Sequence, residues 1–124
     1  MIFALGTDII ETERIGEMVA RGRQHLETVF TVKEIDYCEG KARKSQHYAV
    51  RYAAKEATFK ALGIGWTDGP AYCDIEVLDD ERGKPQVFVH GEVKRLFEKH
   101  GVRQSCVSLS HSRDNAIAVI ILET

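Results

Sequence analysis

An alanine-rich helix is the segment of this sequence that leaves the fold the least freedom. Its central part, residues 51–63, reads Arg-Tyr-Ala-Ala-Lys-Glu-Ala-Thr-Phe-Lys-Ala-Leu-Gly. Alanine combines high helix propensity with little bulk, and Gly63 tolerates the left-handed conformation in which many helices end. The pattern predicts a long helix over about 46–62, followed by a glycine-containing loop over 63–72.

One face of this predicted helix carries an acid and a base. At about 100° per residue, Glu56 and Lys60 share a face with Ala49 and Ala53. The two alanines are too small to cover the charges, so another surface or a ligand can come close. An exposed ion pair one helical turn apart, worth roughly 0.3 kcal/mol, is the alternative explanation. The helix alone does not decide between a site and a solvated surface.

The N-terminal segment carries a second acid. Residues 2–10 read Ile-Phe-Ala-Leu-Gly-Thr-Asp-Ile-Ile, which indicates a strand. Gly6 permits irregular pleating or the close approach of a ligand. Asp8 lies within an apolar run, and a buried carboxylate needs a cation, hydrogen-bond donors or a metal ion. An aspartate in a turn or at a helix cap is the alternative, and both explanations stay open.

Composition and charge limit the classes of function. The 124 residues suffice for one domain with a real core, and the formal net charge of −2 argues against a general nucleic-acid binder. Basic residues nevertheless cluster before an acidic tract. A local basic surface suits a compact phosphorylated anion or an acidic partner, unless it is only a solvated helix flank. The clustered residues are Lys41, Arg43, Lys44, Arg51, Lys55 and Lys60.

Cysteine and histidine usage points away from disulfides and zinc. The three cysteines are widely spaced without a CxxC pair, and the five histidines lack the i, i+4 spacing of a helical zinc site. Acids interrupt the N-terminal apolar run, so neither a signal peptide nor a membrane segment is recognisable. We expect a protein of a soluble, reducing compartment such as the cytoplasm, without nucleic-acid or membrane partners.

The other segments predict an α+β fold. A helix is expected over about 13–22 with Thr12 as its N-cap, and a shorter helix from a capping box at Thr31 to near Gly40. A helix over about 91–100 separates two hairpins, and the last strand is apolar on both faces, as in a central, covered strand. We expect an antiparallel sheet with helices packed on one face. The expected strands are 74–78, 85–89, 106–110 and 116–122.

Asp8 and Glu56 would form a metal site if the fold brought them together. Two carboxylates repel each other unless a cation lies between them or one is protonated. Oxygen ligands without His or Cys suit Mg²⁺, which completes its coordination with water and substrate phosphates. Lys60, Lys55 and Arg51 would neutralise other phosphate oxygens. These parts predict attack at a phosphorus centre.

Three further segments have weaker functional signals. Gly63 and Gly65 would let backbone N–H groups reach a phosphate. Ser110-His111-Ser112 does not indicate a Ser-His hydrolase, because strand neighbours point to opposite faces and no G-x-S-x-G elbow exists. His111 is a turn or packing residue, or it contacts a phosphate or ribose. Gly83-Lys84-Pro85 is a turn with a backbone rigid enough to form one wall of a nucleotide pocket.

Six segments in order resemble the holo-acyl-carrier-protein synthases, the small class of 4′-phosphopantetheinyl transferases. The resemblance spans nearly the whole chain. Any one segment could match by chance, whereas six in the same order are specific. The segments are Gly6–Glu11 with Arg14–Ile15, Phe30–Thr31 with Glu34, Arg51–Ala57 with Lys60–Gly63, Asp74–Val77, Gly83–Pro85 and Ser108–Ser112.

This resemblance implies transfer of the 4′-phosphopantetheine arm of coenzyme A to a serine of apo-acyl carrier protein, a step of fatty acid biosynthesis. The serine hydroxyl attacks the β-phosphorus and 3′,5′-ADP leaves. The resemblance also implies Mg²⁺ at Asp8 and Glu56, a catalytic Lys60, and a homotrimer with sites at subunit interfaces. Whether Glu56 or a metal-bound water accepts the proton stays open. Coenzyme A contacts are expected at Arg43, Arg51, Lys60, Gly63, Gly65, Lys84, Pro85 and His111.

The family docks its acidic carrier protein on the first helix, where this chain has Arg14, Met18 and Arg21. Cations around an exposed methionine suit an acidic amphipathic helix, although ordinary surface residues are the alternative. Thr28 stands where family members often have arginine, which we expect to weaken docking. Ile64 replaces a threonine or serine between two glycines. A noncatalytic oligomer that binds coenzyme A or a nucleotide is the rival function, and it does not need the two acids.

Overall fold

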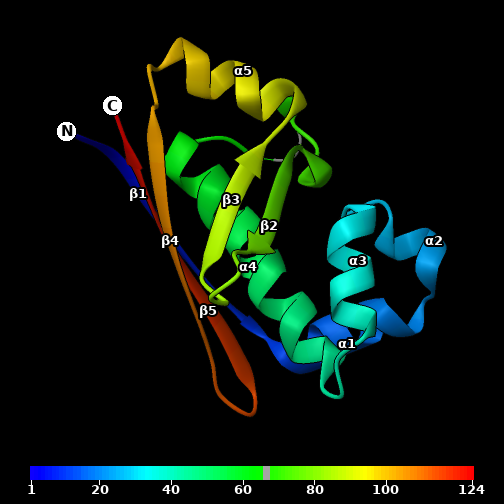
Figure 1. The fold of residues 1–124 in the computed structure, drawn as a ribbon. Helices are drawn as coiled ribbons and strands as arrows, with labels where there is room; N and C mark the ends of the chain where they lie inside the picture. The colour runs from blue at the N-terminus through cyan, green and yellow to red at the C-terminus, as the bar shows by residue number, and fades with distance from the viewer. Residues whose placement is uncertain (66–67) are drawn as a thin grey trace.

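A three-stranded antiparallel sheet and one long helix form the centre of the molecule. The computed structural model describes residues 1–65 and 68–124. The strands of this sheet are β1 (Ile2–Glu11), β4 (Gln104–His111) and β5 (Asn115–Glu123). β5 lies in the middle, and helix α4 (Lys44–Leu62) runs along one face of the sheet (Figure 1).

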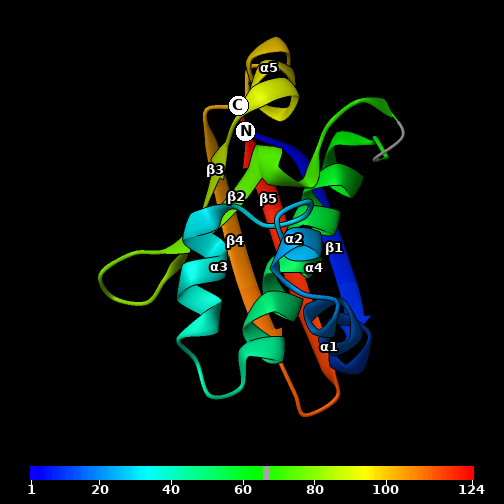
Figure 2. The same ribbon diagram turned by 90° about the vertical axis from the view of Figure 1, so that its right-hand side faces the viewer.

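A hairpin and the remaining helices surround α4. Strands β2 (Ile75–Asp79) and β3 (Pro85–Val89) form a separate two-stranded antiparallel sheet that contacts α4 and β4. The other helices are α1 (Thr12–Ala20), α2 (Arg23–Leu26), α3 (Val32–Glu39), the 3₁₀ helix η2 (Tyr72–Asp74) and α5 (Gly91–Lys99). α1, α2 and α3 lie together beside α4 (Figures 1 and 2). Within the described ranges no helix combines the length and apolarity of a membrane span.

The α+β prediction is confirmed, and several local signals act as expected. Thr31 and Glu34 form the predicted capping box at the start of α3. Gly63 ends α4 in the left-handed conformation with φ 69°. The prediction for Thr12 is wrong, because α1 begins at Thr12 and Glu11 is its N-cap residue. The Thr12 N–H instead donates to the carbonyl of Asp114, so the β4–β5 turn fixes where this helix begins.

One face of the three-stranded sheet is uncovered in the single chain. The even-numbered residues of β5 from 116 to 122 are fully buried on the α4 side. On the opposite face, Leu5 pairs with Ile121 and Ile9 with Ile117, and three of these side chains are at least 42% exposed. β5 is central as predicted, but the expected cover on both of its faces is not met within one chain.

β1 and α4 approach each other closely at a single glycine. A Cβ added to Gly6 would lie 1.9 Å from the carbonyl oxygen of Ala57 and 3.0 Å from the backbone N of Ala61. The register of β1 with β5 is regular at this position, with Gly6 opposite Ile120. Gly6 therefore accommodates the backbone of a helix, and neither a ligand nor an irregular pleat is needed to explain it.

Replacing Gly6 by alanine should destabilise the fold by about 3 kcal/mol, because the new methyl group meets backbone that cannot rotate away. Urea unfolding followed by circular dichroism measures this change. Gly40→Ala is the matched control, since a Cβ there lies 3.6 Å from its nearest neighbour at negative φ. Equal unfolding midpoints for the two variants would show that the β1–α4 contact adapts freely.

Candidate active site

Asp8 lies inside β1 and faces α4. Its Oδ1 atom is 2.9 Å from the Nζ atom of Lys60, which lies on the last turn of the helix. The Asp8 side chain is 13% exposed and that of Lys60 is 56% exposed. The acid therefore has the cation that its apolar surroundings require. The alternative of a turn or cap aspartate does not hold, because the residue lies within a regular strand.

Glu56 lies one helical turn before Lys60 but is not bonded to it. Among the described residues the ion pair of Lys60 is with Asp8, and the Oε1 atom of Glu56 accepts a hydrogen bond from the hydroxyl of Tyr72 at 2.7 Å. The structure therefore does not contain the exposed Glu56–Lys60 ion pair that was the alternative explanation for these charges. The two acids come from β1 and α4, which pack against each other, and Lys60 is bonded only to the first of them.

Lys55 does not belong to the basic surface expected from the sequence. It is fully buried, and its ammonium group donates to Glu34 Oε1 at 2.8 Å, to the carbonyl of Tyr72 at 3.1 Å and to the carbonyl of Ile75. Burial lowers the pKa of Lys55, and the Glu34 carboxylate opposes this shift. Lys55 thus holds α3, η2 and β2 to the helix, and its predicted contact with phosphate is wrong.

Arg51 is also buried, with 2% exposure, so it is not part of an open basic face either. Its Nε atom donates to the carbonyl of Val77 at 3.2 Å, and its guanidinium lies over the ring of Tyr37 at 4.3 Å. Its Nη2 atom lies 3.7 Å from Asp79 Oδ1 and has no hydrogen-bond partner in the described part of the chain. This nitrogen retains donor capacity, although it is buried beside the Asp79 carboxylate.

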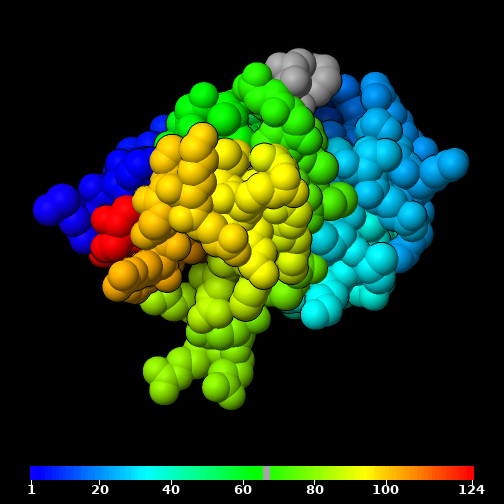
Figure 3. All heavy atoms as spheres, turned by 90° about the horizontal axis from the view of Figure 1, so that it is seen from above, coloured from blue at the N-terminus to red at the C-terminus, as the bar shows by residue number. Residues whose placement is uncertain are grey.

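Five of the eight residues expected to contact coenzyme A line two cavities next to β4, and Lys60, Gly63 and Gly65 line neither of them. Arg51, Lys84 and Pro85 line a cavity of about 350 Å³ between α4, the β2–β3 turn and β4. Arg43 and His111 line another, of about 910 Å³, together with more cations and polar groups. The β2–β3 turn projects from the body of the molecule (Figure 3). Asp8 is on the opposite edge of the sheet, because β5 separates β1 from β4.

The two glycines after α4 use their backbone N–H groups within the chain. The N–H of Gly63 donates to the carbonyl of Lys60 at 3.1 Å, and that of Gly65 to the side chain of Asp68 at 2.7 Å. These donors are occupied in this structure, which differs from the expected anion-binding loop. The short side chain of Asp68 supplies the acceptor that a phosphate would otherwise provide.

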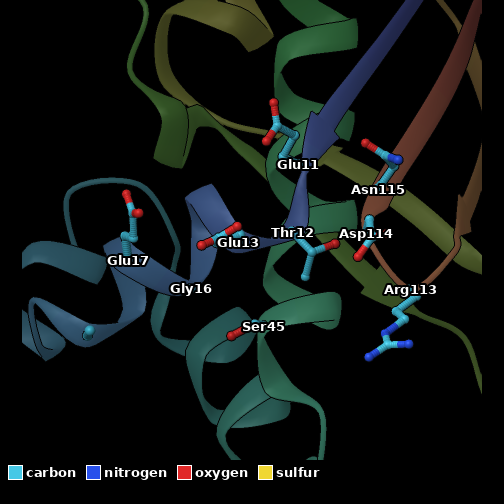
Figure 4. Close-up of a pocket in the computed structure, with 10 residues that line it drawn as sticks. Glu11, Thr12, Glu13, Gly16, Glu17, Ser45, Arg113, Asp114 and Asn115 are labelled. Carbon is cyan, nitrogen blue, oxygen red and sulfur yellow. The ribbon is translucent and has the colours of Figure 1, made fainter.

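The first helix has a mixed surface. Arg14 and Arg21 are exposed, but Met18 is half-buried and packs against the core, so the expectation of an exposed methionine is wrong. A cavity beside this helix contains Thr12 and Ser45 together with acidic groups (Figure 4). None of the expected site residues lines it, and its carboxylates make it unsuited to a phosphate. These acids are Glu11, Glu13, Glu17 and Asp114.

Comparison with known proteins decides the family. The family model of the 4′-phosphopantetheinyl transferase superfamily matches residues 4–120. The chain belongs to this superfamily. A holo-[acyl-carrier-protein] synthase of Geobacter sulfurreducens is 44% identical, and the match covers 99% of this chain and 98% of the relative. That of Ruminiclostridium cellulolyticum is 46% identical, with 98% and 92% coverage.

Solved structures of the same superfamily share the fold. The holo-[acyl-carrier-protein] synthase of Neisseria meningitidis gives a TM-score of 0.89 at 28% identity, with 100% of both chains covered. That of Bacillus anthracis, in complex with CoA (3′,5′-ADP), gives 0.82 at 35% identity, with 100% and 98% coverage. The resemblance expected from the six segments is thereby confirmed. As a 4′-phosphopantetheinyl transferase, the chain is an enzyme.

Sequence reasoning missed one neighbour of the candidate site in this transferase, Tyr72. The residue follows a glycine-containing loop, and its hydroxyl reaches a carboxylate 16 positions earlier in the chain. No local pattern signals this contact. The resemblance does not cover Tyr72 either, since the matching segment begins at Asp74.

Glu34→Gln should destabilise the transferase by roughly 3 kcal/mol or more, because it leaves the Lys55 ammonium buried without a counter-charge. Thermal and urea unfolding measure this loss. Glu39→Gln, on the same helix, is the matched control, since Glu39 is 40% exposed and pairs with Lys44 at the surface. We expect that control to cost less than about 1 kcal/mol. Similar losses for both variants would contradict the structural role given to the buried pair.

Proposed function

We propose that this enzyme transfers the 4′-phosphopantetheine group of coenzyme A to a serine of an apo-acyl carrier protein, with Mg²⁺ dependence and release of 3′,5′-ADP. The observation that carries the proposal is the ion pair between Asp8 of β1 and Lys60 of α4, one helical turn after Glu56. Full-length relatives named holo-[acyl-carrier-protein] synthase support the reaction. The Helicobacter pylori structure in complex with coenzyme A supports the donor substrate. Free cysteines suit a reducing cytoplasm.

The acids at the β1–α4 contact suit a hard divalent cation. Asp8 and Glu56 offer oxygen ligands from two elements, and no group of three or more potential metal ligands occurs in residues 1–65 and 68–124. Mg²⁺ commonly binds one or two carboxylates and leaves its other positions to water and phosphate. Asp8 and Glu56 would hold the ion, which supplies neutralisation of charge on the pyrophosphate. Lys60, being half-exposed, can turn its ammonium group from Asp8 to a phosphate oxygen.

The binding of coenzyme A is assigned to the two cavities beside β4. Lys84 and the guanidinium of Arg51, whose Nη2 atom lies beside Asp79 without a hydrogen bond, offer donors to a phosphate, and Pro85 offers a rigid wall. Arg43 and His111 extend this polar surface in the second cavity. The carrier protein is assigned to α1, where Arg14 and Arg21 are exposed to an acidic partner.

A homotrimer would bring the two halves of the site together. The acids lie at the β1 edge of the sheet and the anion-binding cavities lie at the β4 edge of the same chain. The uncovered apolar face around Leu5, Ile9 and Ile117 provides a surface for neighbouring copies. We therefore assign the acids of one subunit and the cavities of its neighbour to the same active site.

Incubation with coenzyme A, Mg²⁺ and an apo-carrier protein should add a phosphopantetheine group to the carrier, which mass spectrometry detects. Asp8→Ala and Glu56→Ala should each lower kcat/KM on the order of 100-fold or more, because each removes a charge that positions the cation. Glu98→Ala, which removes an exposed acid of α5, is the control. Unmodified carriers after exposure to the native enzyme would exclude transfer. Full activity in an acid variant would remove that residue from the site.

The assembly has its own test, because subunits with different defects can complement each other. Asp8→Ala and His111→Ala should each be impaired, whereas their mixture, after dissociation and reassociation, should recover part of the activity. Light scattering should give a trimer for the native chain and a smaller species for Ile117→Lys. A native monomer with full activity, or a mixture no better than its components, would rule out a site shared between copies.

A further inference from the structure

Tyr72 is bonded to Glu56, a proposed metal ligand, although the proposed reaction assigns it no role. Its hydroxyl donates to Oε1 of Glu56 at 2.7 Å, a short hydrogen bond in partly buried surroundings. Hydrogen bonds to a charged acceptor are roughly twice as strong as those between neutral groups. The hydroxyl is the donor in this bond, because an ionised carboxylate can only accept.

The ring of Tyr72 is held from several sides. It stacks on Tyr52 with ring centroids 5.6 Å apart and meets the edge of Phe59 at 5.3 Å. Its backbone carbonyl accepts a hydrogen bond from the ammonium group of Lys55, which is fixed in turn by Glu34. Both the backbone and the ring are therefore anchored to α4, the helix that carries Glu56. The packing against α4 therefore fixes the position of the hydroxyl, and the loop before Tyr72 is not needed for it.

We propose that Tyr72 is a positioning residue that orients the Glu56 carboxylate for binding the divalent cation. A glutamate side chain has several rotatable bonds, and fixing one oxygen removes conformations that cannot reach the ion. The bond fixes Oε1 and leaves lone pairs on both carboxylate oxygens for the ion. Loss of a hydrogen bond to a metal-ligating carboxylate typically lowers the metal affinity 10- to 100-fold. This inference rests on the metal site of the proposed function.

A second tyrosine–glutamate hydrogen bond, which involves none of the expected site residues, provides a matched control. Tyr48 donates to Glu39 Oε2 at 2.7 Å, also in partly buried surroundings, between α4 and α3. Neither residue lines a cavity together with the proposed metal ligands. Loss of the Tyr48 hydroxyl therefore reproduces the chemical change without touching Glu56. The difference in metal affinity between Tyr72→Phe and Tyr48→Phe therefore measures the contribution of the hydrogen bond to Glu56.

The test measures metal binding directly on the full-length protein, with Mn²⁺ as a paramagnetic probe for the Mg²⁺ site. Electron paramagnetic resonance of free Mn²⁺, without coenzyme A, gives the dissociation constant. We expect Tyr72→Phe to weaken Mn²⁺ binding about tenfold and Tyr48→Phe to leave it unchanged. In the transfer assay, Tyr72→Phe should raise the Mg²⁺ concentration for half-maximal rate, with the KM for coenzyme A unchanged at saturating Mg²⁺. Thermal unfolding checks that both variants are folded.

A double-mutant cycle separates positioning from a structural role. If Tyr72 acts through Glu56, adding Tyr72→Phe to Glu56→Gln should cause no further loss of Mn²⁺ affinity. An equal loss in both backgrounds, or unchanged Mn²⁺ affinity in Tyr72→Phe, would overturn the proposal. Those results leave the proposed function standing if the native enzyme modifies its carrier and Asp8→Ala does not. Absence of Mn²⁺ binding to the native protein would remove the metal site, and this inference with it.

Discussion

Complete burial of the Lys55 ammonium group ties four parts of this enzyme together. From α4 the group donates to Glu34 on α3, to the carbonyl of Tyr72 in η2 and to the carbonyl of Ile75 at the start of β2. A buried ammonium group is tolerated when each of its three hydrogens has an acceptor, as here. Glu34 also accepts from the N–H of Val77 and from that of Thr31, so the same carboxylate completes a helix cap. The helix that carries the charged site residues therefore cannot move independently of its neighbours.

The parts of the fold that depend on local chemistry were predictable from the sequence. The capping box at Thr31, the left-handed end of α4 at Gly63 and the two hairpins follow from a few adjacent residues. The acid at Asp8 was also recognisable, because a carboxylate within an apolar strand has to find a cation. Thr12 failed as a cap because a distant backbone carbonyl, that of Asp114, binds the N–H at the start of α1.

The site was less predictable where burial depends on contacts distant in the chain. Lys55 and Arg51 look like exposed cations on an amphipathic helix, yet their partners Glu34 and Val77 are 21 and 26 positions away. Sequence periodicity gives the face of a helix but not whether another element will cover it. The donor role of Tyr72 has the same origin, since it depends on the path of the chain after α4. Residue chemistry and the resemblance both supplied expected roles for Asp8 and Glu56, but neither gave a role to Tyr72, which is bonded to Glu56.

The separation of the acids from the cavities lined by basic residues has a consequence for how activity would depend on enzyme concentration. The acids lie at one edge of the sheet and the cavities at the other, and β5 lies between them. If a neighbouring copy completes each site, dilution below the dissociation constant of the assembly leaves folded but idle subunits. Turnover per subunit would then rise with expression level. In that case, a small molecule that binds the apolar face of the sheet and prevents assembly would inhibit the enzyme without competing with either substrate.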